Sequence, residues 1–166
     1  MSLRATIAVC AMLILSGCVT TQREPAPPPI SLDAQGIQPT ISGLRIDFGR
    51  AQVGVIDTVS RLLGEGPDQI VTTAECGPGP ITAASWGDGL TLNFQDGAFV
   101  GWVNTDPELA VAGGFRAGQP RLAMPPVSFQ ITSRGTEFAR SDIAGLLTEG
   151  DAAIRLLWAG RTCFAR

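Results

Sequence analysis

The chain has 166 residues, of which 45% are hydrophobic and 16% charged, with a formal net charge of -3 at pH 7. This length is typical of one domain, and the hydrophobic content is too high for a chain that is disordered throughout. All 12 basic residues are arginine and His, Lys and Tyr are absent, which excludes His-based nucleophilic catalysis, imidazole metal ligation and Schiff-base chemistry. The arginines are scattered along the sequence and form no basic cluster for nucleic acid.

Residues 1–17 are predicted to be a signal peptide. Arg4 precedes an uncharged run that ends at Gly17, and this run is too short to span a bilayer. Leu15-Ser16-Gly17-Cys18 resembles the lipobox of bacterial lipoproteins. The resemblance implies cleavage after Gly17 and attachment of lipid to Cys18, which then anchors the chain in the membrane. An ordinary secretory peptide that is cut elsewhere is the alternative.

Val19 stands where inner-membrane lipoproteins of many Gram-negative bacteria carry Asp. By the same resemblance, we expect a lipid-anchored protein of the bacterial cell envelope, in the outer membrane and facing the periplasm.

Residues 18–40 are predicted to be the lipidated cysteine followed by a Pro-rich, disordered tether. Thr20 to Thr40 contains five prolines and little periodicity, which favours an extended chain without packed structure. A proline ligand for a partner's groove at residues 26–29 is the alternative. The folded domain is then expected over residues 41–166.

A disulfide between Cys76 and Cys163 is predicted. Cys10 would leave with the signal peptide and Cys18 would carry lipid, so these two cysteines remain. The periplasm is oxidising, and a remaining pair there is most simply a structural crosslink. A redox-active pair and two free thiols remain as alternatives, although the sequence has no C-x-x-C spacing.

The first elements of the domain are predicted to be a strand over 44–48, a helix over 51–63 and a strand over 70–76. In the helix, Val55, Val59, Leu62 and Leu63 recur at spacings of three and four, and Gly64 supplies the C-terminal stop. We expect this helix to lie on a sheet.

Residues 81–103 predict a three-stranded antiparallel meander. Asp88-Gly89 and Asp96-Gly97 separate its apolar stretches, and Asp-Gly is a strong signal for a two-residue hairpin turn. Two such turns place Phe94 opposite Phe99 on the core face. The outer face then carries a row made of Trp86, Thr91 and Trp102, which is explained either by packing beneath the second half of the chain or by a binding surface.

The second half is predicted to begin with a long connection over 104–126. A strand over 127–132, a short helix over about 141–148 and strands over 152–158 and 162–165 follow. Residues 142–150 echo residues 58–66 in sequence, which indicates a degenerate tandem repeat, with chance similarity as the alternative.

This order of elements predicts the α+β class, with one or two helices on a twisted antiparallel sheet that includes the Trp-rich meander. Residues 44–103, with the run W-x-D-G-L-x-L-x-F-x-D-G-x-F-x-G-W, weakly resemble BamE-type lipoproteins and the related beta-lactamase-inhibitor-like fold. Those families place helices on one side of an antiparallel sheet. The resemblance carries over no functional residue.

The missing residue types and the predicted anchor favour a protein without catalysis, cofactor or metal. Its expected partners are the membrane, through the lipid on Cys18, and a protein or other component of the envelope, but no nucleic acid. The alternative is an inhibitor or a carboxylate-based hydrolase acting on envelope components. A hydrolase would use an acidic pair beside the tryptophans, drawn from four loop residues: Asp88, Asp96, Asp106 and Glu108.

Overall fold

The computed structural model describes residues 28–87 and 89–164. The predicted signal peptide, Cys18 and Asp88 lie outside these residues. Within them, most of the regular structure is β-strand, in two sheets accompanied by one α-helix.

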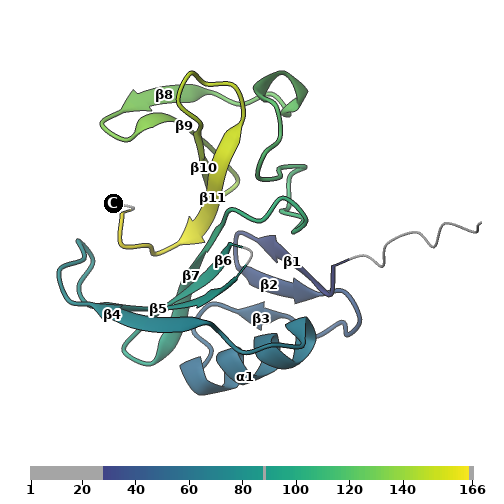
Figure 1. The fold of residues 1–166 in the computed structure, drawn as a ribbon, viewed down its shortest axis with the longest axis vertical. Coiled ribbons are helices and arrows are strands. Elements are labelled where there is room, and N and C mark those ends of the chain that lie inside the picture. Colours follow the sequence, from purple (N-terminus) through teal and green to yellow (C-terminus); the bar gives the residue numbers. More distant parts are fainter. Residues whose placement is uncertain (1–27, 88, 165–166) are drawn as a thin grey trace, which may run out of the picture.

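An antiparallel sheet of eight strands extends through the molecule in the order β4-β5-β6-β7-β11-β10-β9-β8. Figure 1 shows that this sheet is strongly curved, with β4 and β8 at its two ends and the segment after β11 between them. Its strands are β4 Gln69–Thr73, β5 Ile81–Trp86, β6 Leu90–Gln95, β7 Ala98–Asn104, β8 Phe129–Thr132, β9 Gly135–Arg140, β10 Ile143–Leu147 and β11 Ile154–Gly160.

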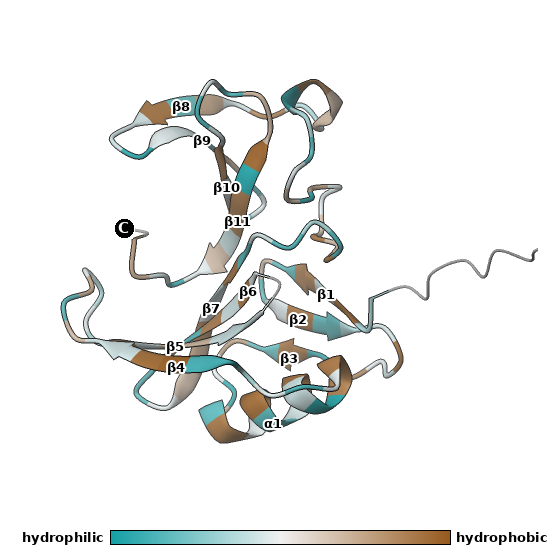
Figure 2. Cartoon of the chain, in the orientation of Figure 1, coloured by the Kyte–Doolittle hydropathy of each residue, from teal (hydrophilic) through white to brown (hydrophobic). Residues whose placement is uncertain are grey.

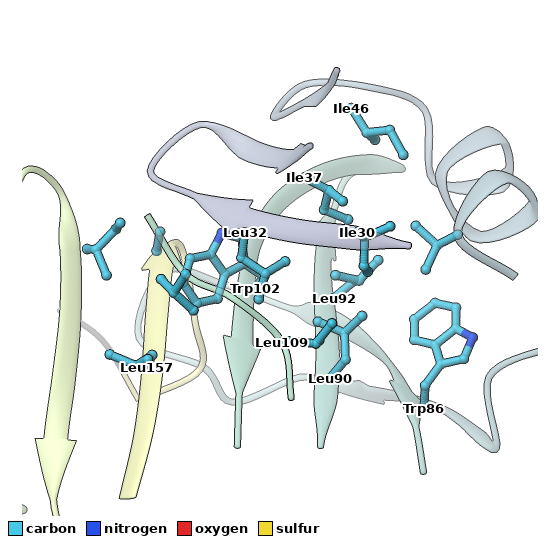
Figure 3. Close-up of a cluster of buried hydrophobic side chains, with 14 of the residues drawn as sticks. Ile30, Leu32, Ile37, Ile46, Trp86, Leu90, Leu92, Trp102, Leu109 and Leu157 are labelled. Carbon is cyan, nitrogen blue, oxygen red and sulfur yellow. The ribbon is translucent and has the colours of Figure 1, made fainter. Parts of the chain in front are cut away.

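A smaller sheet lies on one face of the large one. It consists of β1 Ile30–Asp33, β2 Gly36–Pro39 and β3 Ile46–Asp47, in that order. The main hydrophobic core forms between the two sheets, where β1 and β2 cover β6 and β7 (Figure 3). Its largest fully buried side chains include Ile30, Leu32, Ile37, Leu92, Phe94, Phe99, Trp102 and Leu157.

Helix α1, Gln52–Leu63, confirms the predicted helix. Its buried residues are Val55 and Val59, one turn apart on the face toward the core. Gly64 ends the helix in the left-handed conformation with φ 81°, and its N–H donates to the Ser60 carbonyl. Glycine adopts this conformation without the steric cost that a Cβ would bring.

The predicted α+β class is wrong, because the fold is mostly β with one α-helix in the described residues. The short helix expected near 141–148 is strand β10, which a tight turn joins to β9. Ser141 and Asp142 form that turn with φ 49° and 63°. Since residues 58–66 include the end of a helix and residues 142–150 include a strand, the two segments are not a structural repeat.

The predicted disordered tether is also wrong over residues 30–39, which form the β1–β2 hairpin. Ile30, Leu32 and Ile37 are buried in the core, so the domain begins before residue 41. Pro29 precedes β1 and Pro39 is the last residue of β2. At strand ends, proline does not interrupt the hydrogen-bonded ladder.

The remaining predicted elements were placed with smaller errors. The strands over 44–48 and 70–76 are the shorter β3 and β4, and those over 127–132 and 152–158 correspond to β8 and β11. The connection over 104–126 is irregular apart from a short 3-10 helix, Arg121–Ala123. Residues 162–164 form no strand, and strand β9 was missed.

Candidate functional site

The tryptophans predicted for a binding surface are buried. Trp86 is 3% exposed and Trp102 is 0% exposed. The Trp86 indole Nε1 donates to the Glu65 carbonyl at 3.2 Å, and the Trp102 Nε1 donates to the Asp33 carbonyl at 2.8 Å. Both indoles thus donate to the N-terminal part of the domain, and both lie in a core cluster that also includes residues of the second half. The predicted row is therefore wrong as a binding surface in this fold.

Two departures from the expected register explain the error. The β5–β6 turn has three residues, so Trp86 pairs with Leu90. A β-bulge in the β6–β7 pair places Trp102 opposite Leu92 instead of Thr91. Thr91 lies on the other face, where its hydroxyl is 3.0 Å from the Ser85 hydroxyl. A one-residue change of register moves side chains to the opposite face of a sheet.

The meander itself is confirmed. Asp96 and Gly97 form the second turn with φ 51° and 75°, as a two-residue turn of this type requires. Phe94 pairs with Phe99 as predicted. The bulge begins immediately beyond this pair, so the predicted register holds only next to the turn.

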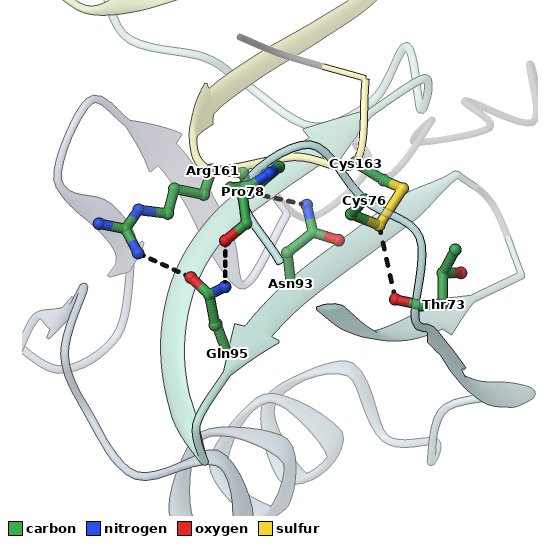
Figure 4. Close-up of a disulfide and its surroundings, with 7 residues drawn as sticks. All are labelled: Thr73, Cys76, Pro78, Asn93, Gln95, Arg161 and Cys163. Carbon is green, nitrogen blue, oxygen red and sulfur yellow. Dashed lines mark hydrogen bonds between the residues drawn. A yellow bond between two sulfur atoms is a disulfide. The ribbon is translucent and has the colours of Figure 1, made fainter. Parts of the chain in front are cut away.

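The Cys76–Cys163 disulfide is confirmed (Figure 4). Cys76 follows β4 and Cys163 follows β11, with 4.8 Å between their Cα atoms. This bond connects an end of the large sheet to a segment that crosses the middle of that sheet.

Polar contacts hold this crossing segment against β6 and β7 (Figure 4). The Asn93 side-chain amide donates to the Arg161 carbonyl at 3.2 Å, and the Arg161 guanidinium donates to the Gln95 side chain at 2.7 Å. The Arg161 backbone N–H also donates to the Val100 carbonyl. A Cβ at Gly101 would lie 2.2 Å from the Arg161 carbonyl oxygen, so only glycine allows this close approach.

Two of the carboxylates considered for catalysis have structural roles. Asp96 forms the β6–β7 turn, and the Asp106 carboxylate accepts a hydrogen bond from the Glu108 backbone N–H at 2.7 Å. Over residues 28–87 and 89–164, no group of three or more Asp, Glu, Cys or His side chains could hold a metal ion. None of the helices in this part of the chain has the length and apolar character needed to cross a membrane.

An ion-pair network joins the beginning of β3 to the end of β1. The Arg45 guanidinium contacts the Asp33 carboxylate at 2.6 and 2.9 Å and the Asp47 carboxylate at 2.9 Å. Partial burial of Asp33 opposes its ionisation, but hydrogen bonds from Arg45 and from backbone N–H groups outweigh this effect and lower its pKa. The same contacts raise the pKa of Arg45, so the pair stays charged.

Replacing Asp33 with asparagine is expected to lower the free energy of unfolding at pH 7 by about 1–2 kcal/mol, because Arg45 loses a charged partner. The folded-state pKa of Asp33 lies below its ordinary value of 3.8. Its contribution to stability is therefore present above pH 3.8 and is lost as the pH falls through the folded-state value. Urea unfolding at pH 7, 4 and 3 should show the difference from the wild type narrowing with acidity.

Asp57→Asn is the matched control, because its exposed pair with Arg61 contributes only about 0.3–0.5 kcal/mol. An Asp33→Asn deficit that stays constant from pH 7 to pH 3 would contradict the assigned role of Asp33.

A groove of about 820 Å³ lies between α1 and the segment from the β2–β3 loop to the start of the helix. Its lining combines apolar side chains from both walls with charged ones: Leu44, Ile46, Val55 and Leu62 together with Arg45, Asp47 and Arg50. The two large side chains of the β2–β3 loop are exposed to solvent: Ile41 by 83% and Leu44 by 79%. Burial of such side chains in a partner or a membrane would be favourable.

Strand β4 forms one edge of the large sheet and pairs only with β5. All five of its residues are exposed, including Ile70 at 52% and Val71 at 43%. The strand contains no charged residue and no proline, which are the usual protection of an edge strand against pairing with another chain. It is therefore an open site for the addition of a strand.

No protein-family model matches the sequence, and no curated protein matches it. The fold is similar to that of the uncharacterised protein yfeY from Escherichia coli. The crystal structure of yfeY matches this chain with a TM-score of 0.51 and 13% sequence identity. The match covers 79% of this chain and 99% of that chain. At this identity the similarity concerns the fold alone.

Sequence reasoning missed both surfaces that the structure exposes. The strand near β4 was predicted, but its position at an edge depends on the order of all eight strands. Ile41 and Leu44 follow a hairpin that the prolines concealed. The available signal for this loop was the presence of two large apolar residues, Ile41 and Leu44, where the predicted tether meets the predicted strand.

Proposed function

We propose that this chain is a lipid-anchored protein of the bacterial envelope that performs no chemistry and binds an extended segment of another envelope protein along β4. The exposed, uncharged edge of β4 is the observation that carries the proposal. The inhibitor or hydrolase alternative gains no support, because the tryptophans that would line its cleft are buried.

Strand addition suits this edge for two reasons. The backbone N–H and C=O groups of an edge strand can form a ladder with an added strand, which provides affinity. Successive side chains of a strand point to opposite faces of the sheet, so Ile70 and Val71 present an apolar contact on each face. A bound segment with small apolar side chains would cover both of them without burying a charge.

The anchor part of the proposal rests on Leu15-Ser16-Gly17-Cys18 and on the position at which the domain begins. Only nine residues, from Val19 to Pro27, separate the lipobox cysteine from the first described residue. The Cys76–Cys163 disulfide supports an oxidising compartment. Val19 supports the outer membrane, with the domain facing the periplasm.

Replacing Cys18 with alanine is expected to move the protein from the membrane fraction to the soluble fraction, because the acyl chains provide the anchor. Fractionation of cells that produce each form, with intact-mass measurement of the purified chains, checks this. Cys10→Ala is the matched control and should leave both location and mass gain unchanged. Membrane retention of Cys18→Ala, or a wild-type chain without acyl chains, would contradict the anchor.

A photoreactive amino acid at position 71 is expected to crosslink to another envelope protein when intact cells are irradiated. Leu122 provides the matched control, because it is an exposed apolar side chain on the 3-10 helix Arg121–Ala123 and does not lie at a strand edge. We expect at least tenfold more adduct from position 71 than from position 122. Equal adduct from both positions would contradict the proposal, as would a single product of twice the chain's mass, which would indicate self-association.

A further inference from the structure

The β2–β3 loop displays two large apolar side chains, Ile41 and Leu44, which we call the loop patch. Both are about four-fifths exposed, and the residues between them are Ser42 and Gly43. The loop tip therefore carries no charge that would have to be desolvated on contact with an apolar phase. Figure 2 shows this loop at the edge of the molecule, after β2.

The loop patch lies beside the point where the described chain begins. The Thr40 backbone N–H donates to the Pro29 carbonyl at 2.8 Å, and its hydroxyl donates to the Pro28 carbonyl at 3.1 Å. The ten residues from Cys18 to Pro27 can span at most about 36 Å when fully extended. A lipid on Cys18 therefore keeps this side of the domain close to the bilayer.

The ends of the loop are fixed to the body of the domain. Pro39, at the end of β2, pairs with Ile30 of β1. At the other end, the Arg45 guanidinium is bound by the carboxylates of Asp33 and Asp47. The loop patch is thus presented on a fixed support.

We propose that the loop patch inserts into the surface of the lipid bilayer beside the anchor and so sets the orientation of the domain. This inference rests on the proposed lipid anchor. Transfer of the two aliphatic side chains of the loop patch from water into the acyl region is favourable. In this orientation β4 faces away from the membrane, because Figure 1 places β4 on the opposite side of the molecule from the loop.

The test uses the complete lipidated chain in vesicles of phosphatidylethanolamine and phosphatidylglycerol that contain lipids brominated on the acyl chains. A tryptophan is introduced at position 44, and the bromine atoms quench its fluorescence only if it enters the acyl region. Ile131→Trp is the control, at an exposed position of β8 away from the loop. The three native tryptophans are each at most 7% exposed, which keeps their contribution to quenching low.

We expect Leu44→Trp to be quenched at least twofold more than Ile131→Trp, and Ile41→Trp to behave like Leu44→Trp. If the chain floats with the vesicles but neither loop variant exceeds Ile131→Trp, the inference is overturned and the anchor stands. If the wild-type lipidated chain fails to float, both the anchor and this inference are overturned.

Discussion

Replacing Cys163 with serine is expected to lower the free energy of unfolding by about 4 kcal/mol under oxidising conditions. The disulfide joins residues 87 positions apart, and a crosslink over such a long loop removes much conformational freedom from the unfolded chain. Guanidinium chloride unfolding of the oxidised wild type and of Cys163→Ser measures the difference.

Three controls test whether the loss comes from the disulfide itself. Cys76→Ser should cost the same free energy, and the double variant should cost no more than either single variant. Addition of a reductant should bring the wild type to the level of the variants. A loss below about 1 kcal/mol for every variant would contradict a stabilising role of the bond.

Replacing Trp102 with alanine is expected to lower the free energy of unfolding by about 3–5 kcal/mol, because it leaves a large cavity in the core. The indole is fully buried between the two sheets, and the substitution also removes its hydrogen bond to the Asp33 carbonyl. Thermal and urea unfolding, followed by circular dichroism, give the difference.

Trp102→Phe separates packing from the hydrogen bond, because it retains an aromatic ring and removes the Nε1 donor. We expect it to cost less than the alanine variant, about 1–3 kcal/mol. A Trp102→Ala protein as stable as the wild type would show that this side chain does not support the core and would return it to the candidates for a binding surface.

The sequence predicted those elements whose signals are local. Gly64 ends α1 and Asp96-Gly97 turns β6 into β7 as expected, because glycine and Asp-Gly act through the backbone conformation of one or two residues. Val55 and Val59 revealed the buried face of the helix, because apolar residues one turn apart lie on the same face. Cysteine counting, together with the predicted oxidising compartment, identified the disulfide without any knowledge of the distance between the two residues.

Features that depend on distant pairing were not predicted. The bulge in the β6–β7 pair has no local signal in its residues, and it reversed the face assigned to Trp102, as the three-residue β5–β6 turn did for Trp86. The Ser141-Asp142 turn contains no glycine, so the sequence predicted a short helix that begins there and includes the apolar run of β10. The prolines around residues 30–39 hid a hairpin whose stability comes from burial of Ile30, Leu32 and Ile37 against the other sheet.

The candidate binding edge was not predicted. The lipobox stays a prediction from a local sequence pattern, whereas the edge position of β4 follows from the complete strand order. Composition excluded whole classes of catalysis, but it could not indicate which side chains are exposed on the folded surface. Side-chain exposure depends on the three-dimensional structure.

The disulfide gives β4 a resistance to pulling that an edge strand otherwise lacks. Tension applied through a partner bound to β4 would peel the strand from β5 one hydrogen bond at a time if that ladder were its only attachment. Cys76, just beyond β4, instead transmits part of the tension to Cys163. From Cys163 the tension passes to Arg161, whose backbone N–H donates a hydrogen bond to the Val100 carbonyl of β7. The centre of the sheet therefore carries part of the load.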